Sequence, residues 1–226
     1  LAMNRQVDGT QVAAAQRLVL EVAEAYRKAP ALTDRVEMKI KLPDGEQVQT
    51  ADLRFARGDA LRMDMDGFTM QWQDSTLYVM IPDVDDKYVA SDQGASFHEA
   101  HQAMFGGDPT FPQLNFRSRP DLSVDEAVSS LSFMLFEDLR VAGHDMVDVK
   151  GRSMHRLNLE SSLGTMHYLV DPETKFLHSG EFEIRPPGMD PMLGTMTFQP
   201  KKMERLATPL TADFGDRTLV PTMQDL

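Results

Sequence analysis

The sequence predicts an α+β fold in which a curved antiparallel sheet packs against amphipathic helices. Between residues 35 and 91, apolar and polar side chains alternate in successive short segments, the pattern of strands with one dry and one wet face. Short turns join these segments, and such turns connect antiparallel neighbours. Residues 10–28 and parts of 96–135 show instead the three- and four-residue spacing of helices.

The first predicted helix covers residues 10–28. Thr10 is a suitable N-cap residue, and Pro30 cannot continue the helical hydrogen bonds, so we expect the helix to end near Lys28. Its apolar residues form one stripe along the helix: Val12, Ala15, Val19, Val22 and Tyr26.

The alternating region predicts a meander of hairpins. The expected strands are 35–42, 51–55, 61–66, 68–73, 77–81 and 87–91. Asp66-Gly67 is a strong two-residue hairpin signal, and Pro43-Asp44-Gly45 predicts another turn. Because the apolar residues share one parity in successive strands, we expect them to gather on a single face of the sheet.

The second half of the chain predicts two helices and then further strands. Ser96 with Glu99, and Ser123 with Glu126, match the capping box that begins a helix. The proline-containing stretch 109–120 between them predicts an extended connector. Later strands are expected around 157–159, 166–170, 176–184 and 195–199. We expect residues 1–208 to form a single domain and residues 209–226, which lack periodicity, to form an extended tail or linker.

Composition excludes several classes of function. The formal charge of −12 disfavours nucleic acid and anionic membrane surfaces as partners. The chain contains no cysteine, which removes disulfides, thiolate nucleophiles and thiolate metal sites. No apolar run approaches the roughly 18 residues of a membrane-spanning helix.

The search for catalytic or metal-binding residues predicts neither an enzyme nor a cofactor site. The spacing of His98 and His101 is one residue short of the zinc protease motif, so we interpret both as surface imidazoles. The alternative, a metal-dependent enzyme, depends on this pair alone. The acidic segment 82–86 lacks the other ligands of a calcium loop and predicts a solvated turn.

The 16 methionines are the most unusual feature of the composition. Methionine is flexible and polarizable, so it fills irregular gaps and accommodates ligands of varied shape. We therefore predict an apolar cavity for an acyl chain, lined by residues of the dry face and of the second helix. The candidates are Val36, Met38, Ile40, Phe55, Met63, Met65, Phe68, Met70, Trp72, Val79, Leu131, Leu135, Met166 and Tyr168. The alternative is that these side chains pack against the helices and fill the core.

The order of elements resembles the LolA/LolB-like lipoprotein-carrier superfamily, and also a group of predicted periplasmic proteins of unknown function. The resembling segments are 22–26 (VAEAY), 61–67 (LRMDMDG), 77–82 (LYVMIP) and 168–177 (YLVDPETKFL). The resemblance spans roughly Val12 to Leu206. It implies an incomplete β-barrel wrapped around helices, an apolar cavity for lipid chains, and an exported protein of the periplasm or cell envelope.

The sequence and the resemblance together predict a non-catalytic carrier or sensor module that binds a lipid, an acyl chain or a lipoprotein. The alternative is a structural or interaction domain with a filled core, which a further domain would accompany. Because the sequence begins at Leu1 rather than at methionine, we expect it to be part of a longer translation product.

Overall fold

The structure is a computed structural model that describes residues 9–42, 45–56, 60–81, 87–92, 94–132, 136, 138–211 and 214–223. Within these ranges the chain forms four helices: α1 (Gly9–Lys28), α2 (Phe97–Phe105), α3 (Pro112–Ser118) and α4 (Val124–Ser130). The same ranges contain thirteen strands: β1 (Ala31–Leu42), β2 (Gly45–Phe55), β3 (Leu61–Met65), β4 (Phe68–Gln73), β5 (Thr76–Met80), β6 (Lys87–Ser91), β7 (Arg140–Val149), β8 (Arg152–Ser161), β9 (Gly164–Val170), β10 (Leu177–Ile184), β11 (Met192–Phe198), β12 (Lys201–Met203) and β13 (Thr218–Val220).

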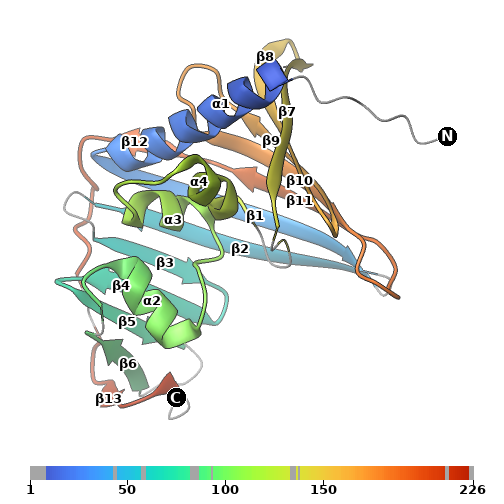
Figure 1. The fold of residues 1–226 in the computed structure, drawn as a ribbon. Helices are drawn as coiled ribbons and strands as arrows, with labels where there is room; N and C mark the ends of the chain where they lie inside the picture. The colour runs from blue at the N-terminus through green and yellow to red at the C-terminus, as the bar shows by residue number, and fades with distance from the viewer. Residues whose placement is uncertain are drawn as a thin grey trace.

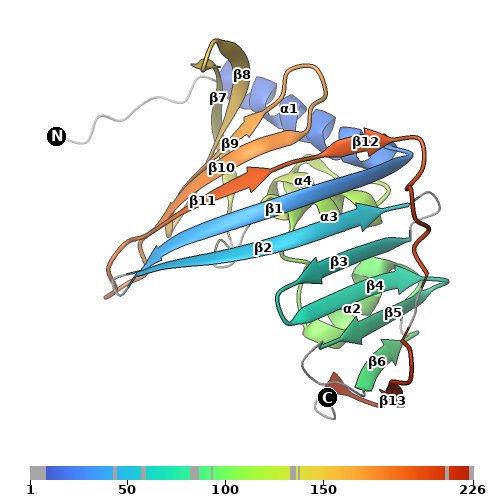
Figure 2. The same ribbon diagram turned by 180° about the vertical axis from the view of Figure 1, so that it is seen from behind.

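The strands form one large sheet that does not close. Their order is β13-β6-β5-β4-β3-β2-β1-β11-β10-β9-β8-β7, and β12 pairs with β1 beside β11. Neighbours are antiparallel except for β13 and β6, which are parallel. The four helices lie on one face of this sheet, as the two opposite views in Figures 1 and 2 show. The predicted α+β class and its open antiparallel sheet are confirmed.

Helix α1 has the predicted extent, and its apolar stripe faces inward. Leu18, Val19, Val22 and Tyr26 are buried, and the helix contacts β7, α3 and α4. The end of α1 is held by Arg117 of α3, which donates hydrogen bonds to the main-chain oxygens of Tyr26 (3.1 Å) and Arg27 (2.7 Å). A guanidinium group there satisfies carbonyls that have no partner within the helix.

The apolar residues that alternate along successive strands lie on the face of the sheet that the helices cover, as predicted. Strand register sets Met63 opposite Met70 and Leu61 opposite Trp72, so alternate residues of β3 and β4 share that face. The same parity continues across β1, where Val36 and Met38 are buried, to β9, where Met166 and Tyr168 are buried. These side chains belong to one continuous hydrophobic cluster.

The middle of the chain differs from the sequence prediction. The connector expected over 109–120 contains α3, whose residues 112–116 are buried. Pro112 is the first residue of this helix, a position where the missing amide hydrogen is no disadvantage. Helix α4 is shorter than expected, because Leu131 is already its C-cap. Strand β7 was not predicted, since its exposed and half-buried residues show little apolar alternation.

The two predicted capping boxes have different outcomes. At Ser123 the box is complete: the hydroxyl accepts from the Glu126 amide, and the Glu126 carboxylate accepts from the Ser123 amide. At Ser96 the hydroxyl accepts from the Glu99 amide, but the Glu99 carboxylate accepts from Ala95 instead. Both arrangements satisfy amides that begin a helix.

Part of the C-terminal segment returns to the sheet. Strand β13 pairs with β6 at the end of the sheet, with Leu219 opposite Tyr88. The ring of Phe214 stacks on Tyr88 at 4.2 Å between centroids and lies 4.7 Å from the ring of Tyr78. These contacts attach residues beyond 208 to the far edge of the sheet (Figure 2).

Candidate binding groove

An apolar groove of about 450 Å³ lies between strands β1–β4 and the segment that runs from α2 to α3; we call it the methionine groove. It is lined by Met38, Gln49, Met63, Met65, Phe68, Met70, His101, Phe105, Gly107, Asp108, Thr110, Phe111 and Leu114. Strand alternation accounts for the floor, because residues two apart on one strand face the same side of a sheet. Met63 and Met65 of β3 therefore both point into the groove, as do Phe68 and Met70 of β4.

The roof of the groove is α2, which lies along β4. Two aromatic contacts fix its direction: Phe97 lies 6.3 Å from Trp72, and Phe105 lies 6.0 Å from Phe68, both between ring centroids. The helix therefore runs antiparallel to β4. The groove is open near the second contact, where the Phe105 side chain is 37% exposed and Phe68 is half-buried.

The two histidines of α2 are half-buried, which corrects the interpretation of both as surface imidazoles. Nδ1 of His101 donates to the main-chain oxygen of Gly107 at 2.9 Å, and burial lowers the pKa of His101. Nε2 of His98 lies 3.5 Å from the Asp108 carboxylate, yet burial still lowers the pKa of His98. Within the described part of the chain, no group of three or more His, Asp or Glu residues is arranged to hold a metal ion.

The predicted cavity residues divide into two groups. Five of them line the methionine groove: Met38, Met63, Met65, Phe68 and Met70. The others that the structure describes are buried in the core outside it: Val36, Ile40, Phe55, Trp72, Val79, Leu131, Met166 and Tyr168. Leu135 lies outside the described residues, as does the acidic segment 82–86. Their role in binding a ligand stays a prediction.

Sequence reasoning missed the roof of the groove. Phe105, Thr110, Phe111 and Leu114 come from the end of α2, from the following loop and from α3. The interpretation of 109–120 as an extended connector removed most of them from consideration. The burial of the segment 111–116 depends on contacts with α1 and the sheet, which no local pattern reveals.

A polar cluster is buried beside the groove, between β1, α1 and α3. Asp34 is only 1% exposed, and its carboxylate accepts hydrogen bonds from Gln113 Nε2 (2.9 Å), the Gln199 amide (2.8 Å) and the Tyr26 hydroxyl (3.5 Å). Burial raises the pKa of Asp34 from 3.8 to about 7, although these donors oppose the shift. The sequence analysis did not identify this cluster, because Asp34 lies just before the strand that was predicted.

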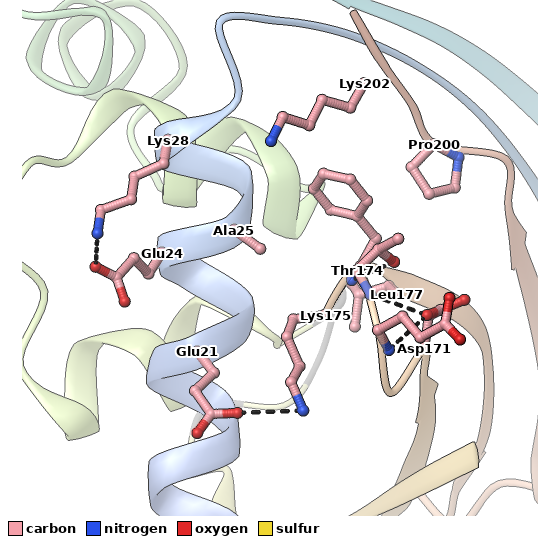
Figure 3. A pocket seen from close by; sticks show the side chains of 12 residues that line it. Glu21, Glu24, Ala25, Lys28, Asp171, Thr174, Lys175, Leu177, Pro200 and Lys202 are labelled. Carbon is pink, nitrogen blue, oxygen red and sulfur yellow. Dashed lines mark hydrogen bonds and ion pairs between the residues drawn. The ribbon is translucent and has the colours of Figure 1, made fainter. Parts of the chain in front are cut away.

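A larger cleft of about 860 Å³ separates α1 from the β9–β10 turn and β12 (Figure 3). Its walls carry Lys28, which pairs with Glu24, and Lys175, whose Nζ lies 3.4 Å from Glu21. Lys202 and Pro200 form the opposite wall. The cleft carries charged side chains of both signs, whereas most of the methionine groove is lined by apolar side chains, so the cleft suits an acyl chain less well.

Comparisons with known proteins find structural likeness without sequence relatives. No family model matches the sequence, and no curated protein matches it either. None of the helices that the structure describes has the length and apolar character needed to cross a membrane.

Several solved structures are similar to this chain over most of its length. An uncharacterized conserved protein from Thermus thermophilus is 11% identical over 92% of this chain and 99% of its own, with a TM-score of 0.48. Lipoprotein LppX from Mycobacterium tuberculosis is 10% identical over 83% of this chain and 94% of its own (TM-score 0.37). A LolA superfamily protein from Nitrosomonas europaea is 10% identical over 84% of this chain and 93% of its own (TM-score 0.34).

Proposed function

We propose that this protein binds the acyl chain of a lipid or lipoprotein in the methionine groove, without catalysis. The observation that carries the proposal is the groove itself: about 450 Å³ of space on a face whose other apolar residues are packed tightly. Small-molecule sites usually measure roughly 300–1,000 Å³ and are lined mainly by apolar side chains.

The chemistry of the lining supports an acyl chain. Met63, Met65 and Met70 form a flexible apolar floor that adapts to chains of different length and saturation. Burial of each methylene group stabilises such a complex by roughly 0.8 kcal/mol. Polar side chains also line the groove, from Gln49 on β2 and from Thr110 before α3, and they offer hydrogen bonds to a head group.

A displacement assay tests the proposal. We expect the purified protein to bind a fluorescent fatty acid and to release it when long-chain amphiphiles are added, and native mass spectrometry should detect copurified lipid. Absence of bound lipid together with absence of dye binding would contradict the proposal.

Two neighbouring positions on β2 provide a matched pair of variants. Gln49 lines the groove, whereas Val48 is 47% exposed on the opposite face of the same strand. The substitution Gln49→Trp places an indole in the groove and should abolish dye binding. Val48→Trp adds the same side chain outside the groove and should leave dye binding unchanged. Equal effects of the two substitutions would place the dye elsewhere.

A second candidate function is a structural or interaction domain whose apolar face is filled by its own side chains. The observation that favours it is the burial of eight of the predicted cavity residues in the core. Under this alternative, neither of the two substitutions on β2 changes dye binding, and added lipid changes no measured property of the protein.

The proposal extends to location and to domain organisation. The family resemblance of the sequence supports an exported protein of the periplasm or cell envelope, in which residues 1–208 form the binding domain and residues 218–220 add β13 to the end of its sheet. Fractionation of cells that express the complete gene product tests the location, since a cytoplasmic pool alone would contradict it.

A further inference from the structure

We propose that the methionine groove also binds a soft monovalent metal ion, Cu(I) or Ag(I), through three thioether sulfurs and one imidazole. Four of the chain's 16 methionines line this one groove, and the chain has no cysteine that would compete for such an ion. Thioethers are soft ligands that select Cu(I) over harder divalent ions. The inference goes beyond amphiphile binding and does not depend on it.

Strand geometry brings three of the methionines together. Met63 and Met70 are direct partners on β3 and β4, so their Cβ atoms lie roughly 5 Å apart. Met65 is two residues along β3 on the same face, roughly 7 Å from Met63. Each side chain is unbranched and has three rotatable bonds, so the three sulfurs can reach one point above the sheet.

Met38 is a wall of the groove rather than a ligand. It lies on β1, and β2 separates it from β3. Strand register also places Met38 four residues beyond the position opposite Met63, so the two backbones are roughly 16 Å apart. The proposed donor set is therefore Met63, Met65, Met70 and a group from the roof.

His101 is the group from the roof. On α2 it stands one helical turn after Phe97 and one turn before Phe105, and its ring contacts both at 5.7 Å and 4.7 Å between centroids. Because those two phenylalanines lie against Trp72 and Phe68, the residues that flank Met70 on the same face, His101 lies above Met70.

The hydrogen bond of His101 leaves one nitrogen for a metal. Since Nδ1 donates to the Gly107 carbonyl at 2.9 Å, the neutral ring keeps its lone pair on Nε2. Histidines that bind metals commonly donate their second nitrogen in this way, which fixes the tautomer and the ring orientation. Burial lowers the pKa of His101, which favours the neutral form of the ring.

The surroundings favour a soft ion of low charge. Phe111 and Leu114 line the groove with buried apolar surface, and the single carboxylate of the lining, Asp108, already accepts from Gln102 Nε2 at 2.9 Å. Calcium and magnesium require several oxygen ligands, which this groove does not supply. The net charge of −12 raises the local concentration of any cation.

Silver nitrate in chloride-free buffer is the first probe, followed by Cu(I) prepared under anaerobic conditions. We expect roughly one Ag(I) per chain to remain after gel filtration, as a soft-ligand site retains its ion. In protein labelled with ¹³C at the methionine methyl groups, the signals of Met63, Met65 and Met70 should shift on addition of Ag(I). Shifts spread evenly over all methionines would overturn the proposal.

Leucine substitutions separate the metal site from the amphiphile site. The triple variant Met63→Leu, Met65→Leu, Met70→Leu keeps the apolar volume but removes the sulfurs, so it should lose Ag(I) while still binding the fluorescent fatty acid. His101→Gln should weaken Ag(I) binding by roughly tenfold or more. The control Met154→Leu, Met196→Leu changes buried methionines outside the groove and should keep both activities.

The outcomes distinguish the two proposals. Retention of Ag(I) by a folded triple variant overturns the metal site, whatever the dye shows. Absence of dye binding in the wild-type protein, when that protein retains Ag(I), contradicts the amphiphile site alone. If the triple variant does not fold, the methyl shifts of the unmodified protein and the single variant Met70→Leu decide.

Discussion

Gln113 donates a hydrogen bond of 2.9 Å from Nε2 to Oδ2 of Asp34, and this bond links α3 to β1 inside the core. The Gln113 Oε1 atom is buried and has no hydrogen-bond partner among the described residues. A protonated Asp34 has a hydroxyl to donate, and a rotated Gln113 amide can accept it through Oε1. The pair therefore has a suitable arrangement for each charge state of the carboxyl group.

The raised pKa of Asp34 predicts a stability that falls as the pH rises. The unfolded chain ionises this group near pH 3.8, whereas the folded chain retains the proton until about pH 7. Between these values the folded state binds more protons, so the free energy of unfolding decreases with pH, by roughly 4 kcal/mol at most. Above about pH 7 this contribution is fully lost.

The variant Asp34→Asn isolates this contribution from those of other titrating groups. Asparagine does not titrate, so the free energy of unfolding of the wild-type protein minus that of the variant should decrease from about pH 5 to about pH 8. Urea unfolding over this range measures the difference. A difference that is constant with pH would show that Asp34 is ionised throughout.

Arg117 predicts a strong effect on stability from a single side chain. It donates to carbonyls at the end of α1 and, through Nη2, to the Ala56 oxygen at 3.2 Å. Arg117→Met leaves these partly buried oxygens without a donor and should lower the free energy of unfolding by about 2–3 kcal/mol. Arg117→Lys should recover only part of this, because one ammonium cannot replace the planar fork.

A surface arginine serves as the control for this change. Arg185 pairs with Glu183 but its side chain is 69% exposed, so Arg185→Met should change the stability little. Chemical denaturation of the three variants provides the comparison. Equal losses at Arg117 and Arg185 would mean that the carbonyl contacts contribute nothing specific.

Gly194 of β11 predicts intolerance of even one methyl group. A Cβ atom there would lie 2.0 Å from the Cζ atom of the Phe182 ring, which covers the glycine from β10. Gly194→Ala should lower the free energy of unfolding by about 1–3 kcal/mol through overpacking. Thermal unfolding measures the loss, and the additional change Phe182→Leu should restore part of it.

Gly107 supplies the matched control for that substitution. A Cβ atom at Gly107 meets nothing within 4 Å, so Gly107→Ala should be nearly neutral for stability. If both alanine variants unfold at the same temperature as the wild-type protein, the close approach at Gly194 is relieved elsewhere in the sheet.

The capping box of α4 predicts a smaller loss. Ser123→Ala removes the acceptor for the Glu126 amide and should lower the free energy of unfolding by about 1 kcal/mol. Ser129→Ala, at an exposed position of the same helix, should have no such effect. Urea unfolding distinguishes the two, and a loss at Ser129 as large as that at Ser123 would contradict the capping role.

The strands were predictable where their period was regular and their turns were short. Asp66-Gly67 fixes the β3–β4 register, and the pairing of Met63 with Met70 follows from it. Strand β7 was missed because its residues show little apolar alternation. It packs against α1, which lies more than a hundred residues earlier in the chain, so no local pattern marks it as part of the sheet. Helix α3 was missed because the prolines of the stretch 109–120 were interpreted as signs of an extended connector, although proline is well suited to the first turn of a helix.

The site was predictable only in part, for a physical reason. Alternation shows which side chains share a face, and it placed Met63 and Phe68 correctly on the dry side. It does not show which part of that face a helix will cover. Tyr168 is fully buried and donates to the Leu131 oxygen at 2.9 Å, whereas Met65 is half-buried and lines the groove.

Strand β13 gives the open sheet a protected end. It consists of three residues, so the outermost main-chain groups that it presents are too few to recruit another strand efficiently. Without it, the longer row of amide and carbonyl groups of β6 would face solvent and offer a template for self-association. A chain that ends before Thr218 should therefore form oligomers at protein concentrations at which the chain that includes β13 remains monomeric.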